Sequence, residues 1–206
     1  ASAPITLKAQ KNLAAVLNSN SGCVPNIGIS ASYVVIDGMR INSVGSCSAP
    51  NSASGTGVRC WEQHPPLAAG PTDTGWVGCV VRNCYIVSNA SSGHAVKTNQ
   101  DFAIVENNVA YGGLEGGFGQ GAIFRNNYVE GGDLWGNSLF CKLAARSCKI
   151  YNNVVRQVTP VASGASAAAG ILIGGSASAN WAYVPGEGHV ACYRCAAWNN
   201  VVISIP

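Results

Sequence analysis

A short phrase recurs along this chain: a run of residues that favour β-strands ends in Asn-Asn, and Val or Tyr follows. Such a repeat constrains the fold strongly, because one copy cannot bury its apolar face alone and must stack on its neighbours. The phrase is clear in Cys148–Val154 and weaker in Cys79–Tyr85, where Cys replaces the second Asn. In an earlier copy, Asp37 takes the place of the first Asn. We therefore expect a repeat protein.

The spacing of the copies predicts the type of repeat. The shorter intervals, of about 19 to 26 residues, suit one coil of a parallel β-solenoid and are too short for most helical repeats. Residues two and four before the first Asn are small or apolar, which places them on the inward side of a strand. We expect an all-β fold, a single-stranded right-handed parallel β-helix of about seven coils. It would form one domain over residues 1–206, without terminal caps.

The asparagines have a structural interpretation. Asn tolerates the left-handed backbone conformation that a sharp corner needs. Stacked Asn amides also hydrogen-bond from one coil to the next and satisfy groups that would otherwise be buried unpaired. We therefore expect an asparagine ladder rather than a catalytic role. Its members would be Asn83, Asn107, Asn126, Asn152 and Asn199.

Two intervals exceed one coil by about twenty residues, which predicts either a long loop or a poorly matching coil in each. The first insertion spans roughly residues 42–73, and its Gly, Ser and Pro content is typical of a loop. The second spans roughly residues 175–188. Both leave after an Asn corner, so we expect both on one side of the solenoid, where binding residues are often found.

Composition limits the partners and the compartment. Charged residues make up 10% of the chain, the formal net charge is +3, and no Lys/Arg cluster exists, so we expect no nucleic acid. No run of 18 apolar residues is present, so we expect no membrane span. Nine cysteines suggest disulfides and an extracellular location, with at least one thiol left over or paired between chains. The spacing favours the pairs Cys79/Cys84, Cys141/Cys148, Cys192/Cys195 and Cys47/Cys60.

The Asn corners, the coil length and the segment Tyr33–Ile41 resemble right-handed parallel β-helix proteins of the pectate lyase and chondroitinase B type. Ala3–Ala9 is also similar to an early coil of that family. The resemblance implies a secreted domain that binds an acidic polysaccharide and cleaves it by β-elimination. Family lyases use a basic residue to remove the proton beside a uronate carboxylate, whose charge is neutralised by Ca²⁺ or Arg.

Three basic residues are the candidate catalytic residues. Lys97 and Lys142 each lie 11 residues before the second Asn of a repeat (108 − 97 and 153 − 142), which predicts one column two coils apart. The segments around them resemble the family's coil that carries a Lys at such a position, and Arg59 is expected nearby. The alternative is that both lysines are solvated on an exterior face.

Aromatic residues in irregular segments are candidate substrate-binding residues, although Trp in a loop equally often plugs an open coil. No nucleophile signature pairs His64, His94 or His189 with a Ser or Cys, and we expect surface histidines. The substrate-binding candidates are Trp61, Trp181, Tyr183 and His189.

We expect no metal site. The family can use Ca²⁺, but Asp73, Asp101 and Asp133 are scattered, so no ligand cluster is evident. Cys192 and Cys195 form the chain's one Cys-x-x-Cys pair, which favours a disulfide or a core sulfur over zinc.

Two interpretations of function remain, and whether the chain is an enzyme stays open. The resemblance favours a polysaccharide lyase-like domain acting along the face of Lys97 and Lys142. The low charge, missing caps and absent metal ligands favour a non-catalytic protomer that stacks end to end into an extracellular filament or adhesin.

Overall fold

The computed structural model describes residues 3–19, 25–43, 56–61, 76–88, 93–117, 119–132, 137–142, 145–158, 169–174, 183–184, 188–189 and 191–205. Over these residues the protein consists of strands β1 to β24 and contains no helix. Most strands belong to three parallel sheets, and consecutive strands along the chain enter the three sheets in turn. The expected all-β class and the parallel stacking of its strands are confirmed.

Sheets A and B each contain seven strands, and sheet C contains six. Sheet A consists of β1 (Ile5–Lys8), β4 (Val34–Asp37), β7 (Val80–Arg82), β10 (Ile104–Glu106), β13 (Ile123–Arg125), β17 (Lys149–Tyr151) and β23 (Ala196–Trp198). Sheet B consists of β2 (Val16–Ser19), β5 (Arg40–Ser43), β8 (Tyr85–Ser88), β11 (Val109–Tyr111), β14 (Tyr128–Glu130), β18 (Val154–Val158) and β24 (Val201–Ile205). Sheet C consists of β3 (Ile27–Ile29), β6 (Val58–Cys60), β9 (His94–Thr98), β12 (Gly113–Gly117), β15 (Leu139–Lys142) and β19 (Ile171–Ile173).

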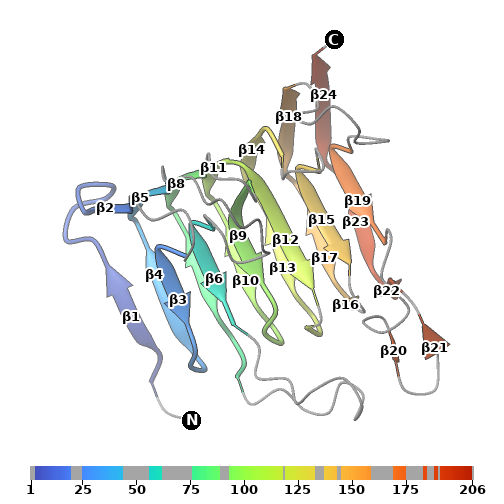
Figure 1. Ribbon diagram of the computed structural model, residues 1–206, viewed down its shortest axis with the longest axis horizontal. Coiled ribbons are helices and arrows are strands. Elements are labelled where there is room, and N and C mark those ends of the chain that lie inside the picture. The colour runs from blue at the N-terminus through green and yellow to red at the C-terminus, as the bar shows by residue number, and fades with distance from the viewer. Residues whose placement is uncertain are drawn as a thin grey trace.

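Two small pairs complete the topology. β16 (Ala145–Arg146) pairs in parallel with β22 (Cys192–Tyr193), and β20 (Tyr183–Val184) pairs antiparallel with β21 (Gly188–His189). Figure 1 shows the strands of each sheet side by side along the longest axis, in chain order from blue to red. The described residues contain no helix with the length and hydrophobicity needed to cross a membrane.

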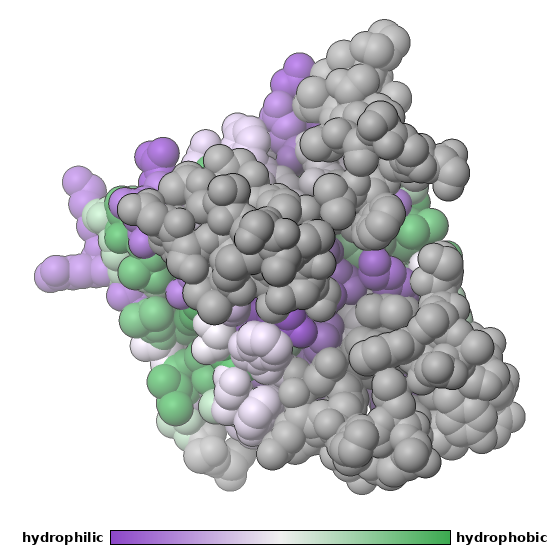
Figure 2. Space-filling model, viewed as in Figure 1, coloured by the Kyte–Doolittle hydropathy of each residue, from purple (hydrophilic) through white to green (hydrophobic). Residues whose placement is uncertain are grey.

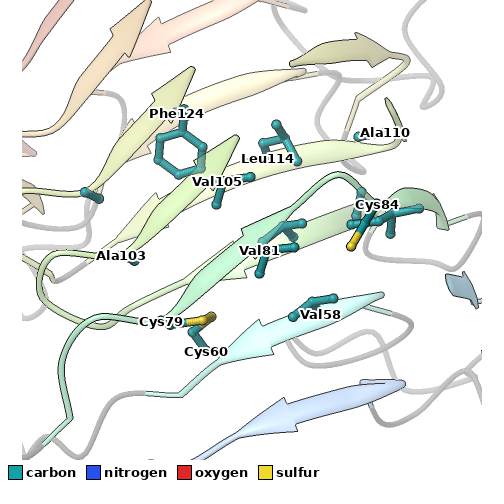
Figure 3. Close-up of a cluster of buried hydrophobic side chains, with 14 of the residues drawn as sticks. Val58, Cys60, Cys79, Val81, Cys84, Ala103, Val105, Ala110, Leu114 and Phe124 are labelled. Carbon is teal, nitrogen blue, oxygen red and sulfur yellow. A yellow bond between two sulfur atoms is a disulfide. The ribbon is translucent and has the colours of Figure 1, made fainter. Parts of the chain in front are cut away.

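Alternation along the strands of sheet A builds the core. The inward row of β7, β10 and β13 is Val81, Val105 and Phe124, all fully buried, and the sulfurs of Cys60 and Cys79 lie near them (Figure 3). The outward row directly before the Asn corner carries charges that pair between coils. The Arg125 side chain lies 2.6 Å from the Glu106 carboxylate, and Arg82 lies 3.1 Å from Asp37.

Where a corner carries two asparagines, each of them has a different structural role. The first Asn has the left-handed backbone conformation, with φ between +50° and +56° from Asn83 to Asn199. The second is buried, and its amide donates to the next: Asn108 to Asn127 (3.1 Å) and Asn127 to Asn153 (3.0 Å). The sequence pattern predicts both the left-handed conformation and the amide bonds between coils for the first Asn. In the structure the corner residue of coils four to six points to solvent, and its successor turns inward.

The stretch expected as the first insertion is not loop throughout. It contains β6, which pairs with β3 and β9 in sheet C. Val58 and Cys60 face the core and are fully buried. The strand has only three residues, and the Gly, Ser and Pro residues around it led to the prediction of a loop. The second expected insertion contains β20 and the first residue of β21.

Disulfide pairing follows position in the core. Cys141–Cys148 and Cys192–Cys195 form as expected. Cys60 bonds Cys79 instead of Cys47, because β6 and the start of β7 bring their Cα atoms to 6.4 Å, within disulfide range. Cys84 is therefore a free, buried thiol, and Cys47 lies outside the described residues. The three disulfides of the described residues are in keeping with an oxidising compartment.

Candidate functional site

The outer face of sheet C brings basic residues together. The parallel register places Gly28 of β3, Arg59 of β6, Lys97 of β9 and Glu115 of β12 next to one another in a row across the strands. Arg59 and Lys97 are 7% and 4% exposed, so neither is a solvated surface cation. The expectation that Arg59 lies near Lys97 is met by this pairing.

Lys142 does not lie in the column of Lys97. Glu115 pairs with Phe140, whereas Lys142 pairs with Gly117, two residues further along the strand. The register changes because the path from this row to the second Asn grows by one residue per coil: 108 − 97 = 11, 127 − 115 = 12 and 153 − 140 = 13. Lys142 still faces the same cluster, with its amine 4.7 Å from the Phe140 ring centroid.

Glu115 is the centre of the cluster, and sequence reasoning missed it. Its carboxylate is fully buried, with one oxygen 2.6 Å from His94 Nε2 and the other 3.1 Å from Lys97 Nζ. His94, which was expected at the surface, is 6% exposed and contacts this carboxylate. The available signal was a lone carboxylate inside the Gly-rich strand Gly113–Gly117. Gly113 pairs with His94 and Gly117 with Lys142, so both glycines leave room for long neighbours.

A bulge in β9 aims His94 at Glu115. Gly113 pairs with His94, but the next residue, Leu114, pairs with Val96, so Ala95 is the extra residue. Without it, His94 and Val96 would share a face, because side chains alternate along a strand. The bulge lets Ala95 and Val96 both join the core while His94 and Lys97 both face outward.

The environment of Glu115 holds it ionised. Burial alone would raise its pKa, but the charge and hydrogen bond of His94 and the charges of Lys97 and Lys142 outweigh that effect. The pKa of Glu115 is therefore lowered well below its usual value.

For the Lys97 amine, burial outweighs the attraction of the neighbouring carboxylate, so its pKa is lowered. Burial lowers the pKa of its amine, Glu115 opposes this shift, and the positive charges of Arg59 and Lys142 add to it. Among the described residues, one carboxylate therefore lies among three basic side chains and His94, and these residues together carry an excess of positive charge. Such a face favours an anionic ligand.

Trp61 extends the cluster toward β3. Its ring lies under the Arg59 guanidinium at 3.7 Å, and its indole Nε1 is 2.9 Å from the position that a Cβ on Gly28 would occupy. Gly28 is therefore needed for this packing. Of the other substrate-binding candidates, Tyr183 and His189 pair across β20 and β21, and Trp181 lies outside the described residues.

Within the described part of the chain, no three His, Cys, Asp or Glu side chains come together as a metal site requires. Asp101 accepts a hydrogen bond of 2.6 Å from the backbone N–H of Gln120, while Asp73 and Asp133 are not among the described residues.

The fold defines an all-β protein of stacked parallel sheets with a buried ionic cluster on the outer face of one sheet. Comparison with protein-family models, with curated proteins and with solved structures finds no match for this chain.

Proposed function

We propose that the protein is a secreted right-handed parallel β-helix of the pectate lyase and chondroitinase B type that binds an acidic polysaccharide and cleaves it by β-elimination. Its coils would be held in register by the asparagine ladder. The substrate would lie on the outer face of sheet C. The observation that carries the proposal is the gathering of Arg59, Lys97 and Lys142 around the carboxylate of Glu115.

The solvent exposure of the three basic side chains suggests their roles. Lys142 is partly exposed, whereas Arg59 and Lys97 lie deeper. We assign to Lys142 the removal of the proton from the carbon beside the uronate carboxylate. The electron pair of the C–H bond then forms the C=C bond as the glycosidic C–O bond breaks. The electron pair of the C–O bond leaves on the oxygen, which takes a proton from the protonated Lys142 amine or from water. Arg59 and Lys97 provide the positive potential that stabilises the charge developing on the carboxylate.

The test is the absorbance of unsaturated uronate product on pectate, alginate and chondroitin. Lys142→Ala should lower the rate by roughly 10²-fold or more, the usual contribution of a positioned base. Lys142→Arg should keep polysaccharide binding, because the charge is retained, but should form product as slowly as Lys142→Ala.

Lys149→Ala is the matched control, because Lys149 is an exposed lysine on the outer face of sheet A. It should leave the rate unchanged. The lyase assignment fails if the wild-type protein forms no unsaturated product on any of the three polysaccharides, or if Lys142→Arg is as active as the wild type.

A second candidate function is structural, and a separate observation favours it. The inward rows of the first and last described coils are open: Leu7 of β1 is 47% exposed and Val202 of β24 is 48% exposed. Hydrophobic residues of this kind gather on the left of Figure 2, where β1 lies. Exposed apolar edge strands pair with other chains. We propose end-to-end stacking of copies into an extracellular filament or adhesin as the alternative.

A further inference from the structure

A second row of corners, where sheet C leads into sheet A, carries a feature that the sheet C cluster does not explain. These corners follow one another along the lower side of the view in Figure 1. Backbone hydrogen bonds align them: Tyr33 N–H donates to Val77 and Phe102 N–H donates to Gln120. Every corner has a residue with positive φ. In order, these are Tyr33 (+57°), Gly78 (+74°), Phe102 (+55°), Gly121 (+70°), Ser147 (+53°) and Arg194 (+53°).

Tyr33 and Phe102 are unexpected residues at such a corner. Bulky side chains are genuine outliers in the left-handed region, and the neighbouring coils use Gly78 and Gly121 for the same bend. Both aromatic side chains are also exposed, at 51% and 55%. Strained backbone and exposed aromatic surface both occur at binding sites, whereas a corner with only a structural role gains nothing from them.

The glycines of the next coils make room for the two rings. A Cβ on Gly78 would lie 2.9 Å from Tyr33 Cδ1, and a Cβ on Gly121 would lie 2.8 Å from Phe102 Cδ1. Each ring therefore rests on the backbone of the following corner, and the aromatic–glycine pair occurs twice in succession. One face of each ring packs against a glycine of the next corner. More than half of each residue's surface remains open to solvent.

We propose that Tyr33 and Phe102 form a stacking platform for alternate sugar rings of a polysaccharide that runs along the long axis of the molecule. The two residues are two coils apart, about 10 Å at ~4.8 Å per strand, which suits every second ring of an extended pyranose chain. Gln120 is exposed beside Phe102 and offers amide groups for hydroxyls. Aromatic walls with a few polar groups are the usual lining of a site for such ligands.

The arrangement fits a glycan better than a protein partner. The two rings are separated by the Gly78 corner and flanked by polar residues, so they do not make the contiguous apolar patch that protein docking uses. Both rings are uncharged, although the Asp101 carboxylate lies beside Phe102 and accepts from Gln120 N–H. The rings lie at a different edge of the molecule from the outer face of sheet C, so the inference does not rest on the proposed lyase activity.

The experiment is affinity gel electrophoresis of the folded protein through soluble xylan, mixed-linkage β-glucan, galactomannan, pectate and alginate. The test variant is Tyr33→Asn with Phe102→Asn. Asn tolerates positive φ, so the corners should keep their shape while the rings are lost. We expect at least one polysaccharide to retard the wild type and the double variant to bind it at least tenfold more weakly. Tyr33→Phe should bind as the wild type does, because it retains the ring.

Two further arms separate this platform from the sheet C cluster. In the gels of uncharged β-glucan and galactomannan, which carry no carboxylate for the sheet C cluster, Lys142→Ala should be retarded like the wild type. The retardation should persist in about 1 M salt, where the screening length is ~3 Å. The proposal is overturned if no polysaccharide retards the wild type, if the double Asn variant is retarded equally, or if Lys142→Ala abolishes the binding.

Discussion

At the scale of single residues, the buried carboxylate of Glu115 carries a large desolvation cost. Removing a carboxylate from water is offset only when close partners and hydrogen bonds replace its hydration. His94 and Lys97 provide these contacts at 2.6 and 3.1 Å. Deleting one member of the group leaves the others as buried charges without compensation, and that penalty exceeds the net gain from the intact cluster.

Glu115→Gln should therefore destabilise the protein by about 3–5 kcal/mol, the usual cost of breaking a buried ion pair. Urea unfolding at neutral pH measures this change. Combining Glu115→Gln with Lys97→Met should recover part of the loss, because the double change removes the unpaired amine as well. A double variant less stable than the sum of its single changes would contradict the pairing.

The same carboxylate predicts an acid-side pH dependence. The pKa of Glu115 is lower in the folded protein than its value of about 4.3 in unfolded chains. Its contribution to stability is thus complete above that unfolded value and is lost as the pH falls toward the folded pKa. The free energy of unfolding should fall less steeply below about pH 4 in Glu115→Gln than in the wild type.

At the scale of elements, the Asn pair explains how β10, β13, β17 and β23 turn into sheet B, whereas Gly38 and Asn83 form the corners after β4 and β7. The first Asn adopts the bend, and the second connects coils through its amide. Asn127 accepts bonds from the Asn108 backbone N–H and side-chain amide, and it donates to Val105 C=O and Asn153 Oδ1. These bonds satisfy backbone groups at a corner that sheet pairing leaves without partners.

Asn127→Leu should therefore cost about 3 kcal/mol or more, because it leaves buried backbone groups of Val105 and Asn108 unsatisfied. Asn126→Gly should change stability by no more than about 1 kcal/mol, since Gly adopts positive φ without strain. Asn126→Val should cost about 1–3 kcal/mol through backbone strain. Thermal unfolding of the three variants checks this order, and a larger loss in Asn126→Gly than in Asn127→Leu would contradict the division of roles.

At the scale of the whole molecule, the open rows at Leu7 and Val202 decide whether copies stack. A head-to-tail contact is heterologous, so it continues from copy to copy and produces a filament. Seven stacked strands give a rise of about 34 Å per copy at ~4.8 Å per strand.

If copies stack, Leu7→Lys and Val202→Lys should each abolish filaments seen by negative-stain microscopy, because each variant closes one end. An equal mixture of the two variants should form dimers and nothing longer, since it contains one open end of each kind. Light scattering measures the mass of each preparation. A monodisperse wild-type monomer at all concentrations would remove the structural alternative.

The sequence by itself determined the class of fold and the identity of the core. Inward and outward positions alternate with period two, and a repeated Asn marks the corner between sheets A and B from Asn83 onward. For that reason the buried row of Val81, Val105 and Phe124 and the charged row beside it could both be predicted from local pattern alone. In the earlier copy Asp37 pairs with Arg82, so Gly38 and not Asp37 takes the place of the first Asn.

Only the tertiary structure decided which residues meet on sheet C. The strands there are separated from the Asn corner by 11, 12 and 13 residues in successive coils, and β9 contains a bulge, so counting along the chain loses the register. The same dependence on long-range pairing explains why Cys60 bonds Cys79 and why His94 contacts Glu115, twenty-one residues away (115 − 94). A local pattern specifies the direction in which a side chain points. Its neighbours across the sheet depend on the number of residues in each coil, which the local pattern does not specify.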